Sequence, residues 1–112
     1  MEGLLTLQCE ACRIDSPKAT DDEIRQFMPL LPDWSIVEIN DVKRLQRVFS
    51  FRDFRDALAF TNQVGELAES EGHHPAIIIE WGRVTVQWWT HKIHGLHRND
   101  FILAAKTDQL IH

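Results

Sequence analysis

Two β-rich runs joined by a tight turn constrain the fold of this chain more than any other feature. Residues 76–81 and 84–90 are rich in β-branched and aromatic residues, and Gly82-Arg83 between them has the chemistry of a turn. Apolar residues occupy alternate positions of the second run: Val84, Val86 and Trp88. Because side chains alternate between the faces of a strand, the pattern predicts a hairpin with one core face and one polar, aromatic face.

An earlier segment has the same character. Residues 34–39 are rich in strand formers, Asn40-Asp41 offers a turn, and apolar residues then recur at even spacing: Leu45, Phe49 and Phe51. We expect a second antiparallel hairpin here. Arg47 falls on the same face as the three apolar residues, which loosens the register.

Helix signals flank and separate the two hairpins. Thr20 followed by Glu23 has the form of a capping box, and two prolines end that helix near Met28. Asp53 opens a longer helix that Gly72 stops, and its apolar residues lie three or four positions apart: Ala57, Phe60, Val64 and Leu67. A last helix is expected over residues 98–111.

The resulting order of elements, αββαββα, predicts the α+β class. Alternating hairpins and helices favour a four-stranded antiparallel sheet with helices packed on one face. Residues 1–18 lack a sustained period and are expected to form an N-terminal arm. Residues 19–112 are expected to form one domain, in keeping with a chain of 112 residues and 44% hydrophobic content.

Composition limits the partners and the location. The 12 basic and 17 acidic residues give a net charge of -5, which disfavours direct binding to nucleic acid. No run approaches the roughly 18 to 20 consecutive apolar residues that span a bilayer, so we expect no membrane contact and a cytoplasmic protein.

Cys9 and Cys12 are too few for a disulfide framework. The pair could be half of a zinc site or a redox dithiol. An incidental pair on the N-terminal arm is the favoured alternative.

Five of the six histidines lie between residues 73 and 97. Histidine exchanges protons near neutrality because its unperturbed pKa is about 6.5. His73 and His74 leave a helix end before Pro75, which restricts the backbone and holds the two imidazoles in place. Adjacent imidazoles repel each other when both are charged, which makes them non-equivalent acid and base candidates. The alternative for an isolated pair is that it caps helix carbonyls or meets solvent.

The polar face of the hairpin expected over residues 76–90 offers further candidates. If the strand extends to its last residues, Trp89 and His91 share a face that suits a flat, hydrogen-bonding ring. The same face could instead be an oligomer contact. His91, His94 and His97 have the spacing of metal ligands, but Gly95 interrupts them, and we expect no metal there.

Several separate segments carry a common signature in a fixed order. They are Phe51-Arg-Asp-Phe54, Ala59-Phe60, Glu71-Gly-His-His-Pro75, Trp81-Gly-Arg-Val-Thr-Val-Gln-Trp-Trp-Thr-His91 and Gly95-Leu-His-Arg-Asn-Asp100. Together they resemble the pterin-4a-carbinolamine dehydratase family, also called 4a-hydroxytetrahydrobiopterin dehydratases. The paired tryptophans and the Glu-Gly before His73 are most similar to the bacterial branch that accompanies phenylalanine hydroxylase.

The resemblance implies a hydro-lyase that dehydrates 4a-hydroxytetrahydrobiopterin to quinonoid dihydropterin by histidine general acid-base catalysis. This reaction supports tetrahydrobiopterin recycling for aromatic amino acid hydroxylation, and it needs no metal or organic cofactor. The implied catalytic residues are His73, His74 and His91. His91 or His73 would transfer protons, and His74 would mainly orient the substrate. The substrate-binding set is Glu69, His73, His74, Pro75, Trp89, Thr90 and His91.

Two positions depart from the family pattern. Gly72 stands where animal members often have an acidic residue, so Glu69 or Glu71 would supply the negative charge. His97 stands where a Ser or Thr commonly caps the last helix, and Asp100 is expected to be structural at that helix start. We expect His94→Ala, His97→Ala and His112→Ala to change turnover little.

The resemblance also leaves a second function class open. Animal relatives act as dimerisation partners of a transcription factor, so a regulatory or interaction module is the alternative to an enzyme. The partners implied by the resemblance are a pterin substrate, a second or further copies of the chain in a homodimer or homotetramer, and a functional link to phenylalanine hydroxylase.

Overall fold

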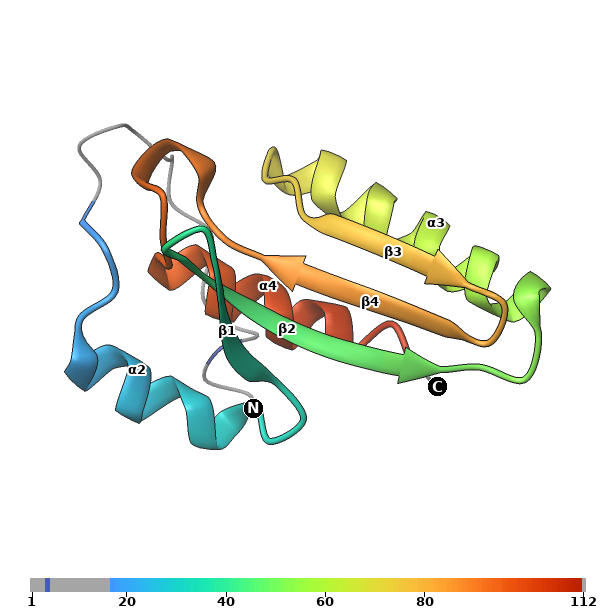
Figure 1. The fold of residues 1–112 in the computed structure, drawn as a ribbon, viewed down its shortest axis with the longest axis horizontal. Helices are drawn as coiled ribbons and strands as arrows, with labels where there is room; N and C mark the ends of the chain where they lie inside the picture. Colours follow the sequence, from blue (N-terminus) through green and yellow to red (C-terminus); the bar gives the residue numbers. More distant parts are fainter. Residues whose placement is uncertain (1–3, 5–16, 112) are drawn as a thin grey trace.

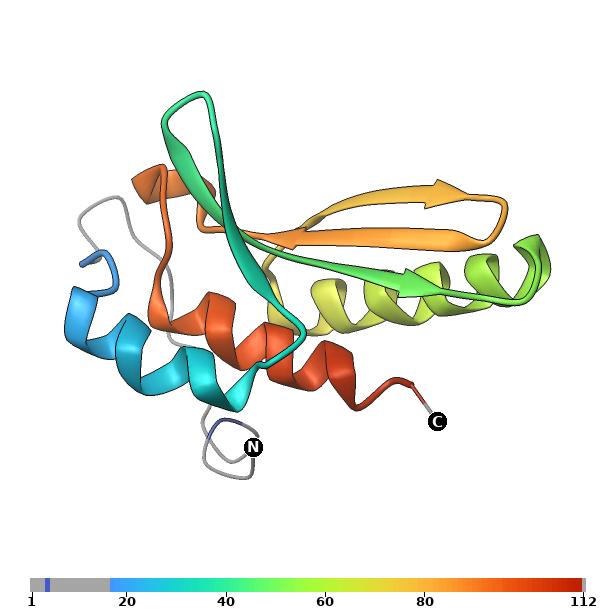
Figure 2. The same ribbon diagram turned by 60° about the horizontal axis from the view of Figure 1, so that its bottom comes forward.

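The computed structural model describes Leu4 and residues 17–111, and it confirms the α+β class with helices covering one face of a four-stranded antiparallel sheet (Figures 1 and 2). The elements are α2 (Asp21–Phe27), η1 (Met28–Leu30), β1 (Ser35–Ile39), β2 (Val42–Ser50), α3 (Phe54–Glu71), β3 (Ala76–Glu80), β4 (Arg83–Trp88), η2 (His91–Ile93) and α4 (Arg98–Asp108). The strands are ordered β1-β2-β4-β3. The two predicted hairpins therefore lie side by side, joined through β2 and β4.

Strand pairing confirms the predicted faces and corrects one turn. Val84, Val86 and Trp88 are fully buried on the helix-covered face. In the hairpin of β3 and β4, however, Glu80 pairs with Arg83, so Trp81 and Gly82 form the turn and the prediction of Gly82-Arg83 is wrong by one residue. An ion pair between the same two side chains, at 2.9 Å, supports the register.

β4 is shorter than the sequence predicted. It ends at Trp88, because Thr90 pairs with Gly95 through an isolated antiparallel bridge that takes the chain out of the sheet. The Thr90 amide donates to the Gly95 carbonyl at 2.9 Å. The prediction that the strand reaches Thr90 is therefore wrong, the condition that it extends to His91 is not met, and His91 instead begins the η2 turn.

The helix ends follow the predicted capping signals. Thr20 and Glu23 form the expected capping box at α2, and Asp53 accepts from the Asp56 amide at α3. Gly72 ends α3 in the left-handed region, at φ 62°. α4 ends at Asp108, three residues before the predicted end. Within residues 17–111, no helix combines the length and the apolar character needed to cross a membrane.

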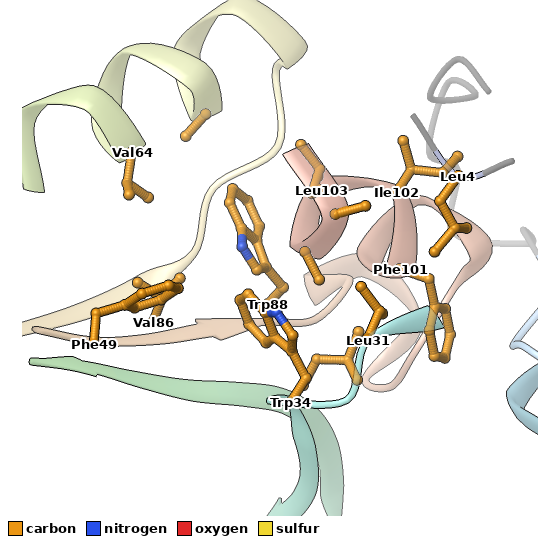
Figure 3. Close-up of a cluster of buried hydrophobic side chains, with 14 of the residues drawn as sticks. Leu4, Leu31, Trp34, Phe49, Val64, Val86, Trp88, Phe101, Ile102 and Leu103 are labelled. Carbon is orange, nitrogen blue, oxygen red and sulfur yellow. The ribbon is translucent and has the colours of Figure 1, made fainter. Parts of the chain in front are cut away.

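The core lies between the sheet and the helices (Figure 3). Trp88 of β4 packs there with Phe101 and Leu103 of α4, and all three are fully buried. Leu4, which belongs to the predicted arm, is also fully buried in this core. The rest of the arm through residue 16, with Cys9 and Cys12, lies outside the described residues, as does His112.

The core face of β2 carries Arg47, as its alternation indicated. Its guanidinium binds Asp108 of α4 at 2.7 Å and lies over the Phe49 ring at 4.4 Å. Asp108 also accepts from the Trp34 indole at 2.9 Å. An ion pair between helix and sheet therefore lets a charged residue occupy the apolar face.

Asp108 gives a pH-dependent stability. Burial raises the pKa of Asp108 above its ordinary value of 3.8, more than its bonds to Trp34 and Arg47 lower it. The folded chain therefore binds a proton here that the unfolded chain releases, so this contribution to stability is lost as pH rises through the folded pKa. We expect the free energy of unfolding of the wild type, measured with urea relative to that of Asp108→Asn, to fall with rising pH. A rise of this relative stability with pH would mean that the ion pair with Arg47 outweighs burial.

Candidate active site

His73 is buried and held by a carboxylate of α4. The left-handed Gly72 ends α3 and passes the chain to His73, whose side chain is 7% exposed. His73 Nε2 lies 2.8 Å from Asp100 Oδ1, and Asp100 is fully buried. A carboxylate accepts hydrogen bonds, so this contact places a proton on Nε2 and fixes the tautomer and orientation of the neutral ring.

Asp100 joins three segments of the chain at this point. Its Oδ2 accepts from the Thr90 hydroxyl at 2.9 Å and from the His97 amide at 2.8 Å. The His97 ring caps the same helix, because its Nδ1 accepts from the Asn99 amide at 3.0 Å. His97 thus replaces the hydroxyl expected at this cap, and Asp100 both completes the cap of α4 and bonds to His73.

His74 and His91 are both exposed, and the His91 ring contacts the backbone of His74. His74 Nε2 lies 2.7 Å from Glu69 Oε1, and both side chains are exposed. His91 Nε2 lies 3.1 Å from the backbone carbonyl of His74. A carbonyl can only accept, so His91 carries a proton on Nε2 and its Nδ1 is the basic nitrogen of the neutral ring.

An aromatic wall flanks His91. Although β4 ends before it, the ring of Trp89 still lies 4.3 Å from the His91 ring, tilted by 35°. Trp89 is half-buried and His91 is exposed, so the indole supplies a flat surface next to an accessible imidazole. On the buried side, the Trp88 ring lies 6.0 Å from the His73 ring.

The structure brings most of the predicted site residues to one end of the sheet. His91 bonds to the backbone of His74, and Asp100 bonds to both His73 and Thr90. Glu69 bonds to His74, Trp89 lies against His91, and Pro75 follows the histidine pair. Glu69, rather than Glu71, supplies the negative charge at His74, because Glu71 binds Lys106 at 2.9 Å.

His94 and His97 do not join this group. His94 is exposed at the end of η2, and His97 is buried at the start of α4. Among the described residues, no three His, Cys, Asp or Glu side chains are placed to hold a metal ion. A hollow of about 200 Å³ lies beside the turn that follows η2. It is lined by His94 and by residues of β1, β2 and α2, and the three site histidines do not line it.

Sequence reasoning missed Arg44. Its guanidinium carbon lies 3.8 Å from the centre of the Trp89 ring, so a cation of β2 stacks on the predicted aromatic wall. Arg44 lies about 30 residues before the histidine cluster, and only the pairing of β2 with β4 brings it to the site. The alternation along β2, taken alone, indicated only that Arg44 faces away from the core.

This arrangement suits proton exchange with a flat polar ring. The site contains one buried imidazole oriented by a carboxylate, two exposed imidazoles on adjoining loops, and an indole surface beside them. Histidines placed within reach of one ligand can deliver and remove protons in the same reaction.

Comparison with known proteins identifies related chains. Residues 17–110 match the family described as pterin 4 alpha carbinolamine dehydratase. A protein of Nitrosococcus oceani, provisionally named pterin-4-alpha-carbinolamine dehydratase, is 62% identical over 111 residues, covering 99% of this chain and 98% of the relative. A protein of Syntrophotalea carbinolica with the same provisional name is 60% identical over 111 residues, covering 99% of each chain.

Two solved structures share the fold. The transcriptional coactivator/pterin dehydratase from Brucella melitensis superimposes with a TM-score of 0.76 at 27% identity, covering 86% of this chain and all of that one. A pterin dehydratase-like protein described as a RuBisCO assembly factor of the alpha-carboxysome gives a TM-score of 0.59 at 23% identity, covering 70% of this chain and 88% of that one. The second likeness shows the fold alone.

Proposed function

The chain belongs to the pterin-4a-carbinolamine dehydratase family, and on that premise we propose that it dehydrates 4a-hydroxytetrahydropterins to quinonoid dihydropterins. It is then a hydro-lyase whose substrate is formed by a pterin-dependent aromatic amino acid hydroxylase. The provisional names of the two relatives support the reaction class.

The reaction needs two proton transfers. The C4a–O bond breaks as the hydroxyl takes up a proton and leaves as water, while N5 gives up its proton and its electron pair forms the C4a–N5 double bond. One imidazole must therefore donate and another must accept. Each such group contributes roughly 10² to 10⁴ in rate.

The convergence of His73, His74 and His91 is the observation that carries this proposal. We assign the two proton transfers to His73 and His91, because these come from different segments that the contact of His91 with the His74 carbonyl brings together. The basic nitrogen of His91 is Nδ1, since its Nε2 bonds to the His74 carbonyl. His74, bonded to Glu69 at 2.7 Å, orients the pterin, and Trp89 lines the site beside His91.

The decisive experiment generates the carbinolamine in situ with a pterin-dependent phenylalanine hydroxylase and follows quinonoid dihydropterin by absorbance. We expect the protein to accelerate dehydration in proportion to its concentration, with the same rate after treatment with a chelator, since imidazoles alone can move both protons. Dehydration no faster than the spontaneous reaction would refute the proposed activity.

Exposed apolar side chains support self-association as part of this proposal. Phe54 and Leu58 on α3 and Ile78 on the open sheet face are each about half exposed, at 45%, 45% and 51%. Light scattering would give the number of copies. An interaction module without catalysis remains the competing function, and the dehydration assay separates the two.

A further inference from the structure

A chain of polar side chains crosses the open face of the sheet, on the side away from the helices. The pairing of β2 with β4 places Gln46 opposite Gln87 and brings Arg44 next to Trp89. Gln87 Nε2 donates to Gln46 Oε1 at 2.7 Å, and Arg44 Nη1 donates to Gln87 Oε1 at 3.0 Å. Gln87 is only 6% exposed, so one end of the Arg44 guanidinium is anchored to a buried amide.

The other contact of this guanidinium is the face of Trp89. The guanidinium carbon lies 3.8 Å from the ring centre, within the range of a cation–π contact. Arg44 Nε is buried and has no hydrogen-bond partner among the described residues, which is a cost for a charged donor. Arg44 Nε therefore has no hydrogen bond among the described residues in the position where the guanidinium lies over the indole.

His91 lies against the same indole. It follows the end of β4, its side chain is exposed, and it contacts the Trp89 ring at 4.3 Å and the His74 carbonyl at 3.1 Å. An exposed imidazole with two such contacts changes rotamer easily if one of them is weakened. The order of contacts is thus Gln46, Gln87, Arg44, Trp89 and His91.

We propose that Arg44 is a positioning residue of the dehydration site: its guanidinium, anchored by Gln87, holds Trp89 against His91 and so fixes the imidazole that transfers a proton. The expected effect on the reaction rate rests on the proposed function. The expected effect on the position of the His91 ring rests on geometry alone. Arg44 acts through Trp89, so its loss should lower the rate of the chemical step more than substrate binding.

The test compares Arg44→Ala with Lys43→Ala, a matched control that removes a neighbouring, exposed cation of the same strand. We expect Arg44→Ala to lower kcat roughly 3- to 20-fold with KM within about threefold, from the usual strength of cation–π contacts. Lys43→Ala should match the wild type. Arg44→Lys, which keeps the charge but loses the planar guanidinium, should lie between the wild type and Arg44→Ala.

Proton NMR of the His91 ring gives a readout without substrate. In the wild type, the ring current of Trp89 should displace the His91 ring signals, and His91→Ala identifies them by their loss. Arg44→Ala should move these signals toward those of an unstacked imidazole, while Lys43→Ala leaves them in place.

Three results would overturn the positioning role: unchanged His91 signals in Arg44→Ala, a kcat within twofold of the wild type, or a loss confined to KM. The last would make Arg44 a substrate-binding residue. If the wild type fails to accelerate dehydration, the proposed function fails, and the NMR comparison still decides whether Arg44 positions His91.

Discussion

Replacing His91 with alanine will lower kcat for carbinolamine dehydration by at least tenfold, and by about 10²-fold if His91 is a full proton carrier. The folded state should hardly change, because the side chain is exposed and buries little surface. The free energy of unfolding should stay within about 0.5 kcal/mol of the wild type. Dehydration kinetics and urea unfolding of the same preparation would measure both quantities.

His94 provides the matched control for that substitution. It is an exposed histidine three residues away, but it is not part of the site, and its φ of 51° favours asparagine over alanine. We expect His94→Asn to keep wild-type turnover. Equal losses in His94→Asn and His91→Ala would show that the effect comes from the η2 turn and not from the His91 imidazole.

Substitution of Asp100 should have the largest combined effect on stability and activity. Asp100→Ala leaves the His73 ring, the Thr90 hydroxyl and the His97 amide without their buried acceptor. We expect it to lower the free energy of unfolding by about 2 to 4 kcal/mol, because buried donors lose their hydrogen bonds. Activity measurements on this variant alone could not separate misfolding from loss of function.

Asp100→Asn separates these two effects. Its one amide oxygen can still accept from Thr90 and His97, while its NH₂ group then faces His73 Nε2 and favours the opposite imidazole tautomer. We expect a stability loss of only about 1 to 2 kcal/mol but a fall in kcat of about 10²-fold or more, since a wrong tautomer is a severe defect in histidine catalysis. Wild-type turnover in Asp100→Asn would show that Asp100 is structural only.

His97→Ala is the control for the structural half of this argument. The His97 ring is buried and caps α4, so its removal should cost about 1 to 2 kcal/mol of stability. The His97 amide still donates to Asp100 in this variant, and turnover should stay within about twofold of the wild type. We therefore still expect His97→Ala to change turnover little, and we now also expect a loss of stability.

Most of the fold could be read from local patterns. Alternation along residues 84–88 predicted the buried face of β4, and the Thr20 and Asp53 caps began their helices as expected. The errors lie where long-range contacts overrode local preference. Thr90 is a good strand former, yet its bridge to Gly95 and its bond to Asp100 end the strand before it.

The site shows the same division between short-range and long-range information. The sequence by itself predicted which groups would carry the chemistry, because His73, His74 and His91 stand in segments that resemble those of the family. Only the tertiary structure decided how each imidazole is oriented. Asp100 is 27 residues from His73, and Arg44 acts on Trp89 across a strand pairing. Contacts between distant segments depend on how the sheet and α4 pack together, and no local period records them.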